Sequence, residues 1–205
     1  METPDSFDAI ARARCWVEEA IRTAPHLGPA GATPIEVATA MSLATADADG
    51  NPSVRYVLLK QVDARGFVFY TNYESRKGLE LEVRARAAVA IWWPWLGRQL
   101  RAEGAVRRLP GAESDAYFAT RPRLSQVSAW ASRQSRELAD PSDLDARIRE
   151  VEARFRETVP RPPHWGGYRL DPQRIEFWTA REGRLHDRVL AERDDAGWRA
   201  RRLYP

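Results

Sequence analysis

Residues 55–77 read RYVLLKQVDARGFVFYTNYESRK. Two apolar runs, at 56–59 and 67–70, flank a turn-forming segment at 63–66, and this pattern predicts a β-hairpin. The polar break after the hairpin leads into residues 75–77, Ser-Arg-Lys, which open a segment with helical spacing. A serine and two cations at a helix N-terminus suit a phosphate group, because free backbone N–H groups and the helix dipole favour an anion there. A hairpin with a solvated basic rim is the alternative interpretation.

The first strand of this hairpin carries a cation near each end, Arg55 and Lys60. The two residues are five positions apart, so a regular strand places their side chains on opposite faces. Either the two cations serve different ligands, or a β-bulge re-aims one of them.

The composition bounds the class of protein. The chain has 205 residues, of which 43% are hydrophobic and 30% charged, which is ordinary for a globular domain with a real core. No apolar run is long enough to span a bilayer, and the acidic, polar N-terminus is unlike a signal peptide. The single cysteine, Cys15, excludes an intrachain disulfide, so we expect a reducing cytoplasm.

The net charge of +3 comes from arginines interleaved with acidic residues, without a block of like charges. This pattern disfavours nucleic-acid binding, and a small anionic ligand explains the local clusters of cations equally well.

The remaining pattern predicts a single domain over 1–205 that is mainly β with peripheral helices. We expect an N-terminal helix within 1–25 capped by Ser6, barrel strands over 40–110, a helical insert over 111–160 and C-terminal strands over 165–205. Tight hairpin succession indicates an antiparallel barrel instead of βαβ units. The C-terminal strands are expected at 165–170, 174–178, 188–193 and 198–203.

Several common sites are excluded by their missing motifs. Neither a G-x-G-x-x-G fingerprint after a strand nor a phosphate-binding P-loop is present. His26, His164 and His186 lack metal-ligand spacing, so no metal site is expected. There is also no G-x-S-x-G nucleophile motif. Phosphate-suited groups with aromatic and amide neighbours remain, and they suit a phosphorylated aromatic cofactor.

Five stretches in order give a family resemblance: RYVLLK (55–60), FYTNYESRK (69–77), YFATRPRLSQ (117–126), SRQS (132–135) and IEFWTAREGRLHDR (175–188). Together they resemble the pyridoxamine 5′-phosphate oxidase family over nearly the whole chain. The resemblance implies a split β-barrel and a homodimer with FMN at the subunit interface. It also implies oxidation of pyridoxine or pyridoxamine 5′-phosphate to pyridoxal 5′-phosphate, with O2 reduced to H2O2.

The resemblance also implies roles for individual residues. The substrate phosphate would be gripped by four side chains, Lys60, Tyr117, Arg121 and Ser125, and the substrate ring would lie under the catalytic pair Arg184 and His186. The FMN site would comprise Arg55, Lys60, Tyr70, Thr71, Ser75, Arg76, Lys77, Gln99, Gln134, Ser135, Trp178 and Arg188, partly from the other subunit.

Two features depart from the family pattern. From the resemblance we expect the chain to lack the N-terminal arm that covers the substrate in many members. Thr179 and Gly183 stand where other residues are usual, so closure over the substrate is expected to be looser. Structural roles for Trp178 and His186 are the alternative to ligand contact. The competing functions are a related FMN oxidase of another aromatic substrate, such as a phenazine precursor, and a non-catalytic flavin-binding protein.

Overall fold

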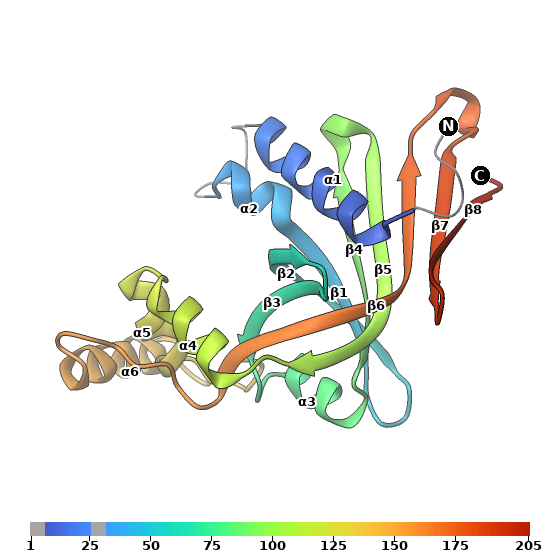
Figure 1. The fold of residues 1–205 in the computed structure, drawn as a ribbon. Coiled ribbons are helices and arrows are strands. Elements are labelled where there is room, and N and C mark those ends of the chain that lie inside the picture. Colours follow the sequence, from blue (N-terminus) through green and yellow to red (C-terminus); the bar gives the residue numbers. More distant parts are fainter. Residues whose placement is uncertain (1–6, 26–31) are drawn as a thin grey trace.

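The computed structural model describes residues 7–25 and 32–205. Its strands form one antiparallel sheet in the order β3-β2-β1-β4-β5-β6-β7-β8, and an additional β3–β6 pairing closes six of them into a barrel (Figure 1). The split barrel expected from the sequence is therefore confirmed. The strands are β1 (Ala40–Ala46), β2 (Pro52–Asp63), β3 (Gly66–Asn72), β4 (Arg86–Trp93), β5 (Arg98–Arg108), β6 (Trp165–Thr179), β7 (Asp187–Asp194) and β8 (Gly197–Leu203).

Six α-helices are added to the barrel within the described residues. They are α1 (Ala9–Thr23), α2 (Pro34–Thr39), α3 (Arg76–Val83), α4 (Gly111–Ala119), α5 (Arg123–Ala131) and α6 (Pro141–Arg154). The predicted cap of α1, Ser6, is outside the described residues. The actual cap is Asp8, whose carboxylate accepts the N–H groups of Ile10 and Ala11, so the predicted cap was wrong.

The strand β6 corrects a second expectation. Two strands were predicted at 165–170 and 174–178, but β6 is continuous across Pro172. Its pairing with β3 ends at Leu170 and its pairing with β7 begins at Arg174, while the register with β5 shifts opposite Gly104. A proline is tolerated at such a bulge, where its missing N–H disturbs the hydrogen-bond ladder least.

The strand β2 has its irregularity at Lys60. Its register with β3 shifts between Leu59 and Gln61, so Lys60 is the extra residue of a bulge. Leu59 and Val62 are buried while Lys60 and Gln61 between them are exposed. The alternation from Ser53 to Leu59 is regular, so Lys60 still lies on the face opposite to Arg55, and the bulge changes the phase of the strand only after Lys60. This outcome favours the first of the two alternatives, in which the two cations serve different ligands.

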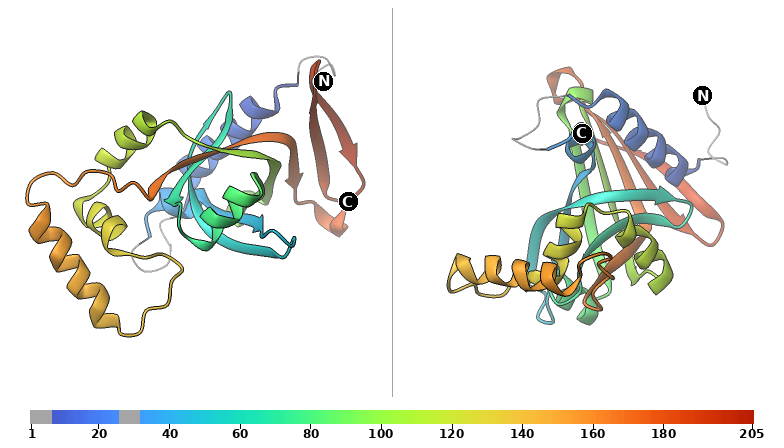
Figure 2. Two further views of the ribbon diagram at one scale, coloured as in Figure 1. Left: turned by 90° about the horizontal axis from the view of Figure 1, so that it is seen from below. Right: turned by 90° about the vertical axis from the view of Figure 1, so that its left-hand side faces the viewer.

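The core fills the barrel and continues under α1. Trp16 on α1 packs edge-on against Trp93 and Phe177, with ring centroids 6.5 and 5.1 Å apart. Two views at right angles show α4–α6 gathered on one side of the barrel and β7–β8 extending from the other (Figure 2). No helix in the described part of the chain combines the length and apolar character needed to cross a bilayer.

Candidate functional site

The helix α3 begins at the phosphate-suited sequence of residues 75–77. Ser75 caps it, because its Oγ accepts the backbone N–H of Gly78 at 3.3 Å. Gly78 is required here, since a Cβ would lie 2.1 Å from the carbonyl oxygen of Tyr73. The close approach of α3 to the end of β3 thus fixes the two cations that open the helix, Arg76 and Lys77.

Lys77 links this helix to a distant loop. Its Nζ donates to Ser75 Oγ and to Gln134 Oε1, both at 3.2 Å, and Gln134 Oε1 also accepts Thr71 Oγ1 at 3.3 Å. Burial, followed by the charge of Arg55, lowers the pKa of Lys77 to about 8. Four predicted cofactor residues, Thr71, Ser75, Lys77 and Gln134, therefore form one hydrogen-bonded group.

Arg55 and Arg76 meet on a residue that the sequence analysis missed, Glu80. Its carboxylate accepts Arg76 Nε at 2.8 Å and Arg55 Nη2 at 3.2 Å. Burial would raise the pKa of Glu80, but hydrogen bonds from Ser53, Thr45 and Arg76 and the charge of Arg55 lower it to about 2. The spacing of Arg76 and Glu80, four residues apart on a predicted helix, was an available signal.

A cavity of about 370 Å³ opens beside this group. The predicted residues that line it are Tyr70, Thr71, Lys77, Arg121, Ser125 and Gln134. Ser135, with a positive φ of 70°, lies apart from them and lines another cavity of about 390 Å³ together with Arg76.

A neighbouring cavity of about 390 Å³ collects all four residues predicted to grip the substrate phosphate: Lys60, Tyr117, Arg121 and Ser125. It shares Tyr70, Arg121, Ser125 and Trp165 with the cavity beside Lys77. The two cavities therefore have a common wall.

Arg121 has no acceptor for its charge within the described residues, and its Nη1 is buried without a hydrogen-bond partner. Burial lowers the pKa of Arg121, and burial also lowers that of Lys60. Two cations at one cavity, one of them with a buried nitrogen that lacks an acceptor, make a suitable environment for an anion.

The common wall is a stack of aromatic rings. Tyr70 and Tyr117 are stacked with centroids 3.9 Å apart, and Trp165 lies parallel to Tyr70 at 5.4 Å. The guanidinium of Arg121 lies over the Trp165 ring, 4.6 Å from its centroid. The sequence analysis did not single out Trp165, because a lone tryptophan at the start of a strand is ordinarily core.

A third group of predicted residues lies on β5, β6 and β7. Gln99 pairs with Trp178, and Trp178 pairs with Arg188 on the next strand. Arg188 is held by Glu176, whose Oε1 accepts its Nε at 2.8 Å, while the other carboxylate oxygen accepts Arg101 at 2.6 Å. Burial raises the pKa of Glu176, but the hydrogen bond from Arg188 and the charge of Arg101 bring it below its usual value.

Arg184 and His186 lie in the connection between β6 and β7. The ring centroids of His186 and Trp178 are 4.4 Å apart, so this connection packs against the end of β6. Gly183 and Arg184 both take left-handed conformations, with φ values of 63° and 59°. Because such a conformation is uncommon outside glycine, the backbone holds Arg184 in a specific direction at this tight turn.

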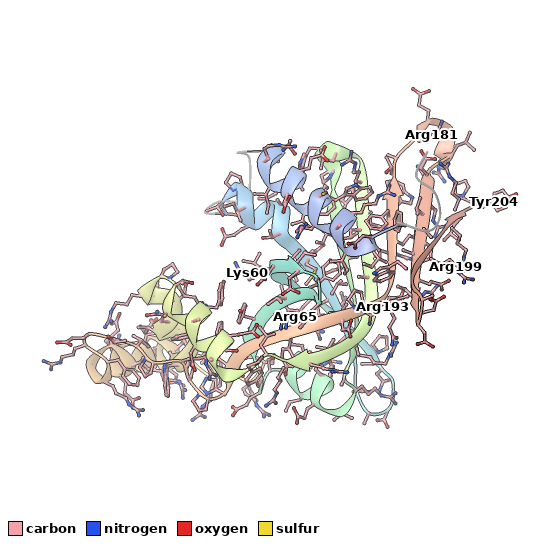
Figure 3. The ribbon with its side chains drawn as sticks, in the orientation of Figure 1. Lys60, Arg65, Arg181, Arg193, Arg199 and Tyr204 are labelled. Atoms are coloured by element: carbon pink, nitrogen blue, oxygen red, sulfur yellow. The ribbon has the colours of Figure 1, made fainter. Side chains whose placement is uncertain are left out.

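These predicted residues do not all meet within one chain. None of the third group, Gln99, Trp178, Arg184, His186 and Arg188, lines the two adjoining cavities. Figure 3 shows Lys60 facing the side of α4 and α5, whereas Arg181, close to Arg184, is at the far end of β6. A single chain thus brings together the phosphate-suited residues but leaves the catalytic candidates apart.

No cluster of histidine, cysteine and acidic side chains within residues 7–25 and 32–205 could hold a metal ion.

Comparison with known proteins identifies the family and a dimerisation region. Residues 28–155 match the family described as "Pyridoxamine 5'-phosphate oxidase". The chain belongs to this family. Residues 165–205 match the description "Pyridoxine 5'-phosphate oxidase C-terminal dimerisation region", which supports a homodimer. This region contains four of the five separated residues, Trp178, Arg184, His186 and Arg188, whereas Gln99 lies outside it on β5.

Curated relatives are similar over nearly their full length. The chain is 53% identical to the pyridoxine/pyridoxamine 5'-phosphate oxidase of Anaeromyxobacter dehalogenans over 97% of this chain and 96% of the relative. It is 48% identical to that of Thermosynechococcus vestitus, over 100% and 92%.

Among solved structures, PhzG from Burkholderia lata in complex with tetrahydrophenazine-1-carboxylic acid matches with a TM-score of 0.86. It has 32% identity, and the match covers 100% of this chain and 98% of that one. A pyridoxamine 5'-phosphate oxidase-related, FMN-binding protein from Nostoc punctiforme, at 15% identity and a TM-score of 0.73, supports the fold alone.

Proposed function

We propose that the protein is an FMN-dependent oxidase that converts pyridoxine or pyridoxamine 5′-phosphate to pyridoxal 5′-phosphate. One observation carries the proposal: the four substrate-phosphate candidates line a single cavity, which shares a wall with the cavity beside the Lys77 group. Relatives at about 50% identity carry the corresponding name.

The residues present fit the phosphate of FMN. A phosphate dianion needs several donors, and the N-terminus of α3 offers Lys77 with the capped first turn of the helix, next to Arg55 and Arg76. Gln134 and Thr71 extend this donor group toward the cavity. We place the phosphate end of the cofactor at this helix start and its ring system along the cavity wall.

The substrate phosphate would occupy the second cavity. Arg121 offers a guanidinium with a buried nitrogen that lacks an acceptor, and Lys60, on the face of β2 opposite to Arg55, offers an ammonium. Tyr117 and Ser125 add hydroxyl donors from α4 and α5. An unphosphorylated substrate would leave the buried nitrogen of Arg121 without an acceptor, which argues for a phosphorylated one.

A second subunit would complete the site. Gln99, Trp178 and Arg188 would reach the cofactor from the partner, and Arg184 and His186 would lie over the substrate ring. The C-terminal dimerisation region supports this arrangement, because it holds most of these residues. The lone cysteine and the reducing conditions that it suits favour the cytoplasm.

Bound FMN supplies the two-electron acceptor, which O2 reoxidises with release of H2O2. The alcohol carbon of pyridoxine phosphate loses two electrons and two protons to become the aldehyde. The amine of pyridoxamine phosphate is oxidised to an imine, which takes up water and releases ammonia. The chain's own groups would position the substrate, and His186 would hold or move a proton.

Anaerobic reduction tests the proposal. The FMN-loaded protein is mixed with pyridoxine 5′-phosphate without oxygen while the visible flavin band is followed. We expect bleaching that air reverses with release of H2O2, and no comparable bleaching by unphosphorylated pyridoxine. An unchanged band with FMN demonstrably bound would refute the proposed substrate.

The structural match to PhzG favours one alternative substrate class, a reduced tricyclic carboxylic acid. The same anaerobic assay distinguishes the two substrate classes, because a substrate without a phosphate does not need the phosphate-binding residues. Bleaching by a reduced phenazine precursor, retained after Lys60→Ala, would select the alternative.

A further inference from the structure

Glu80 is a buried acid within an otherwise basic group of residues. Its side chain is 5% exposed, on the face of α3 that packs against β1 and β2 at the lower rim of the barrel (Figure 1). Four side chains donate to it: Thr45 Oγ1, Ser53 Oγ at 2.6 Å, Arg55 Nη2 at 3.2 Å and Arg76 Nε at 2.8 Å.

The two oxygens of this carboxylate divide the donors between elements. Oε1 accepts Arg76 from the first turn of α3, while Oε2 accepts the β1 and β2 side chains. Thr45 and Ser53 face each other in the β1–β2 register, so Glu80 bridges a paired position of the sheet. One carboxylate therefore sets the position of α3 and of both arginines relative to the barrel.

Such a buried charge is retained only when it is well paired. Glu80 meets this condition with two cations and two hydroxyls, and it stays ionised throughout the neutral range because its pKa is about 2. Glu80 in turn restricts the two arginines before the phosphate binds. Long flexible side chains otherwise lose much conformational freedom when they bind an anion. A partner that already holds them reduces that loss at the moment of binding.

We propose that Glu80 is a positioning residue that holds Arg55 and Arg76 in place for the cofactor's phosphate. This inference rests on the proposed function, and it adds a residue that the sequence analysis did not assign to the site. A purely electrostatic effect of Glu80 has the opposite sign: a negative charge near the phosphate repels it, so its removal would tighten binding. Whether FMN affinity falls or rises when Glu80 is neutralised therefore distinguishes the positioning effect from the electrostatic one.

The test compares Glu80→Gln with wild type in the binding of two flavins, FMN and riboflavin, measured by quenching of flavin fluorescence. Riboflavin lacks the phosphate, so it reports on the ring site alone. We expect Glu80→Gln to bind FMN about tenfold more weakly and riboflavin as wild type does. Glu82→Gln is the matched control, because Glu82 is on the same helix, is exposed and pairs only with Arg108 among the described residues.

Three outcomes overturn the inference. They are unchanged FMN binding, tighter FMN binding, and an equal loss for both flavins, which would mean a general structural role. If wild type itself shows no preference for FMN over riboflavin, the proposed cofactor site fails and this inference fails with it. Ser53→Ala, which removes one donor to the same carboxylate, keeps the test available if Glu80→Gln folds poorly. We expect it to cause a smaller loss, again confined to FMN.

Discussion

Lys77 Nζ donates to Gln134 Oε1 across a separation of 57 residues, at 3.2 Å. The contact joins the start of α3 to the loop after α5, so it brings the basic helix start and the SRQS segment to one place. Gln134 Oε1 also accepts Thr71, which leaves its amide nitrogen available to a ligand. This relationship joins candidate cofactor residues from two segments that are distant in the sequence.

Lys77 predicts a pH dependence of FMN binding. Its pKa in the ligand-free protein is about 8, lowered chiefly by burial, and a bound phosphate would favour the charged form. Above pH 8 the free protein must take up a proton to bind FMN. We expect the Kd for FMN to rise by up to about tenfold per pH unit above pH 8. Below pH 7 Lys77 is already protonated in the free protein, so its titration should not affect the Kd.

The control is Lys77→Gln, which should bind FMN weakly and without this rise. A wild-type Kd that stays constant from pH 7 to pH 9.5, measured in steps of about half a pH unit, would contradict the assignment.

The same group affects the stability of the protein without FMN. Its folded pKa is below the unfolded value of 10.5, so between pH 8 and pH 10.5 the unfolded chain binds more protons. The contribution of Lys77 to stability should therefore increase with pH in this window. The unfolding free energies of wild type and Lys77→Gln can be measured by urea denaturation at pH 8 and pH 10. From pH 8 to pH 10, wild type should gain stability relative to Lys77→Gln.

Arg121 predicts a separation of substrate binding from cofactor binding. Arg121→Ala should raise KM for pyridoxine 5′-phosphate by about 10- to 100-fold, because a charge-assisted bond to the phosphate is lost. FMN content should stay near that of wild type. Steady-state kinetics with measured flavin occupancy tests this, and loss of flavin together with activity would mean that Arg121 serves the cofactor. Arg123→Ala, on the same helix start but directed to the carbonyl groups of Phe155 and Glu157, is the control.

Gly78 predicts a stability effect at the start of α3. An alanine Cβ would meet the Tyr73 carbonyl oxygen at 2.1 Å, so Gly78→Ala should destabilise the protein by roughly 2 kcal/mol or more and weaken FMN binding. Gly111→Ala is a matched control at another helix start, where the nearest atom lies 3.8 Å away. Thermal unfolding checks both, and equal melting temperatures for the two variants would contradict this packing argument.

The sequence predicted the barrel because its strands alternate and its turns carry glycine, proline and aspartate at fixed places. It could not predict that β6 continues through Pro172, since this depends on the exchange of partner strands from β3 to β7. The sequence left open whether a bulge re-aims Lys60, and only the β2–β3 register shows that the bulge leaves Lys60 on the face opposite to Arg55. Local periodicity does not contain such long-range pairing.

The candidate site was predicted unevenly for a similar reason. Motifs pointed to residues with unusual chemistry, such as Lys60, Arg121 and Lys77, which the structure brings to two adjoining cavities. Glu80 and Trp165 were missed, because an acid on an amphipathic helix and a tryptophan in a strand are ordinary until their partners are known.

The central claim is that each site is shared between two subunits, and mixed dimers test it most directly. Arg121→Ala disables the cavity half, and Arg184→Ala disables the half on the β6–β7 connection. Each variant alone, with FMN bound and assayed at a substrate concentration near the wild-type KM, should have little activity. Unfolded together in equal amounts and refolded, they form mixed dimers in which one of the two sites joins intact halves. The account predicts recovery of roughly one quarter of wild-type activity. No recovery above the separate variants, with mixed dimers shown to be present, would contradict it.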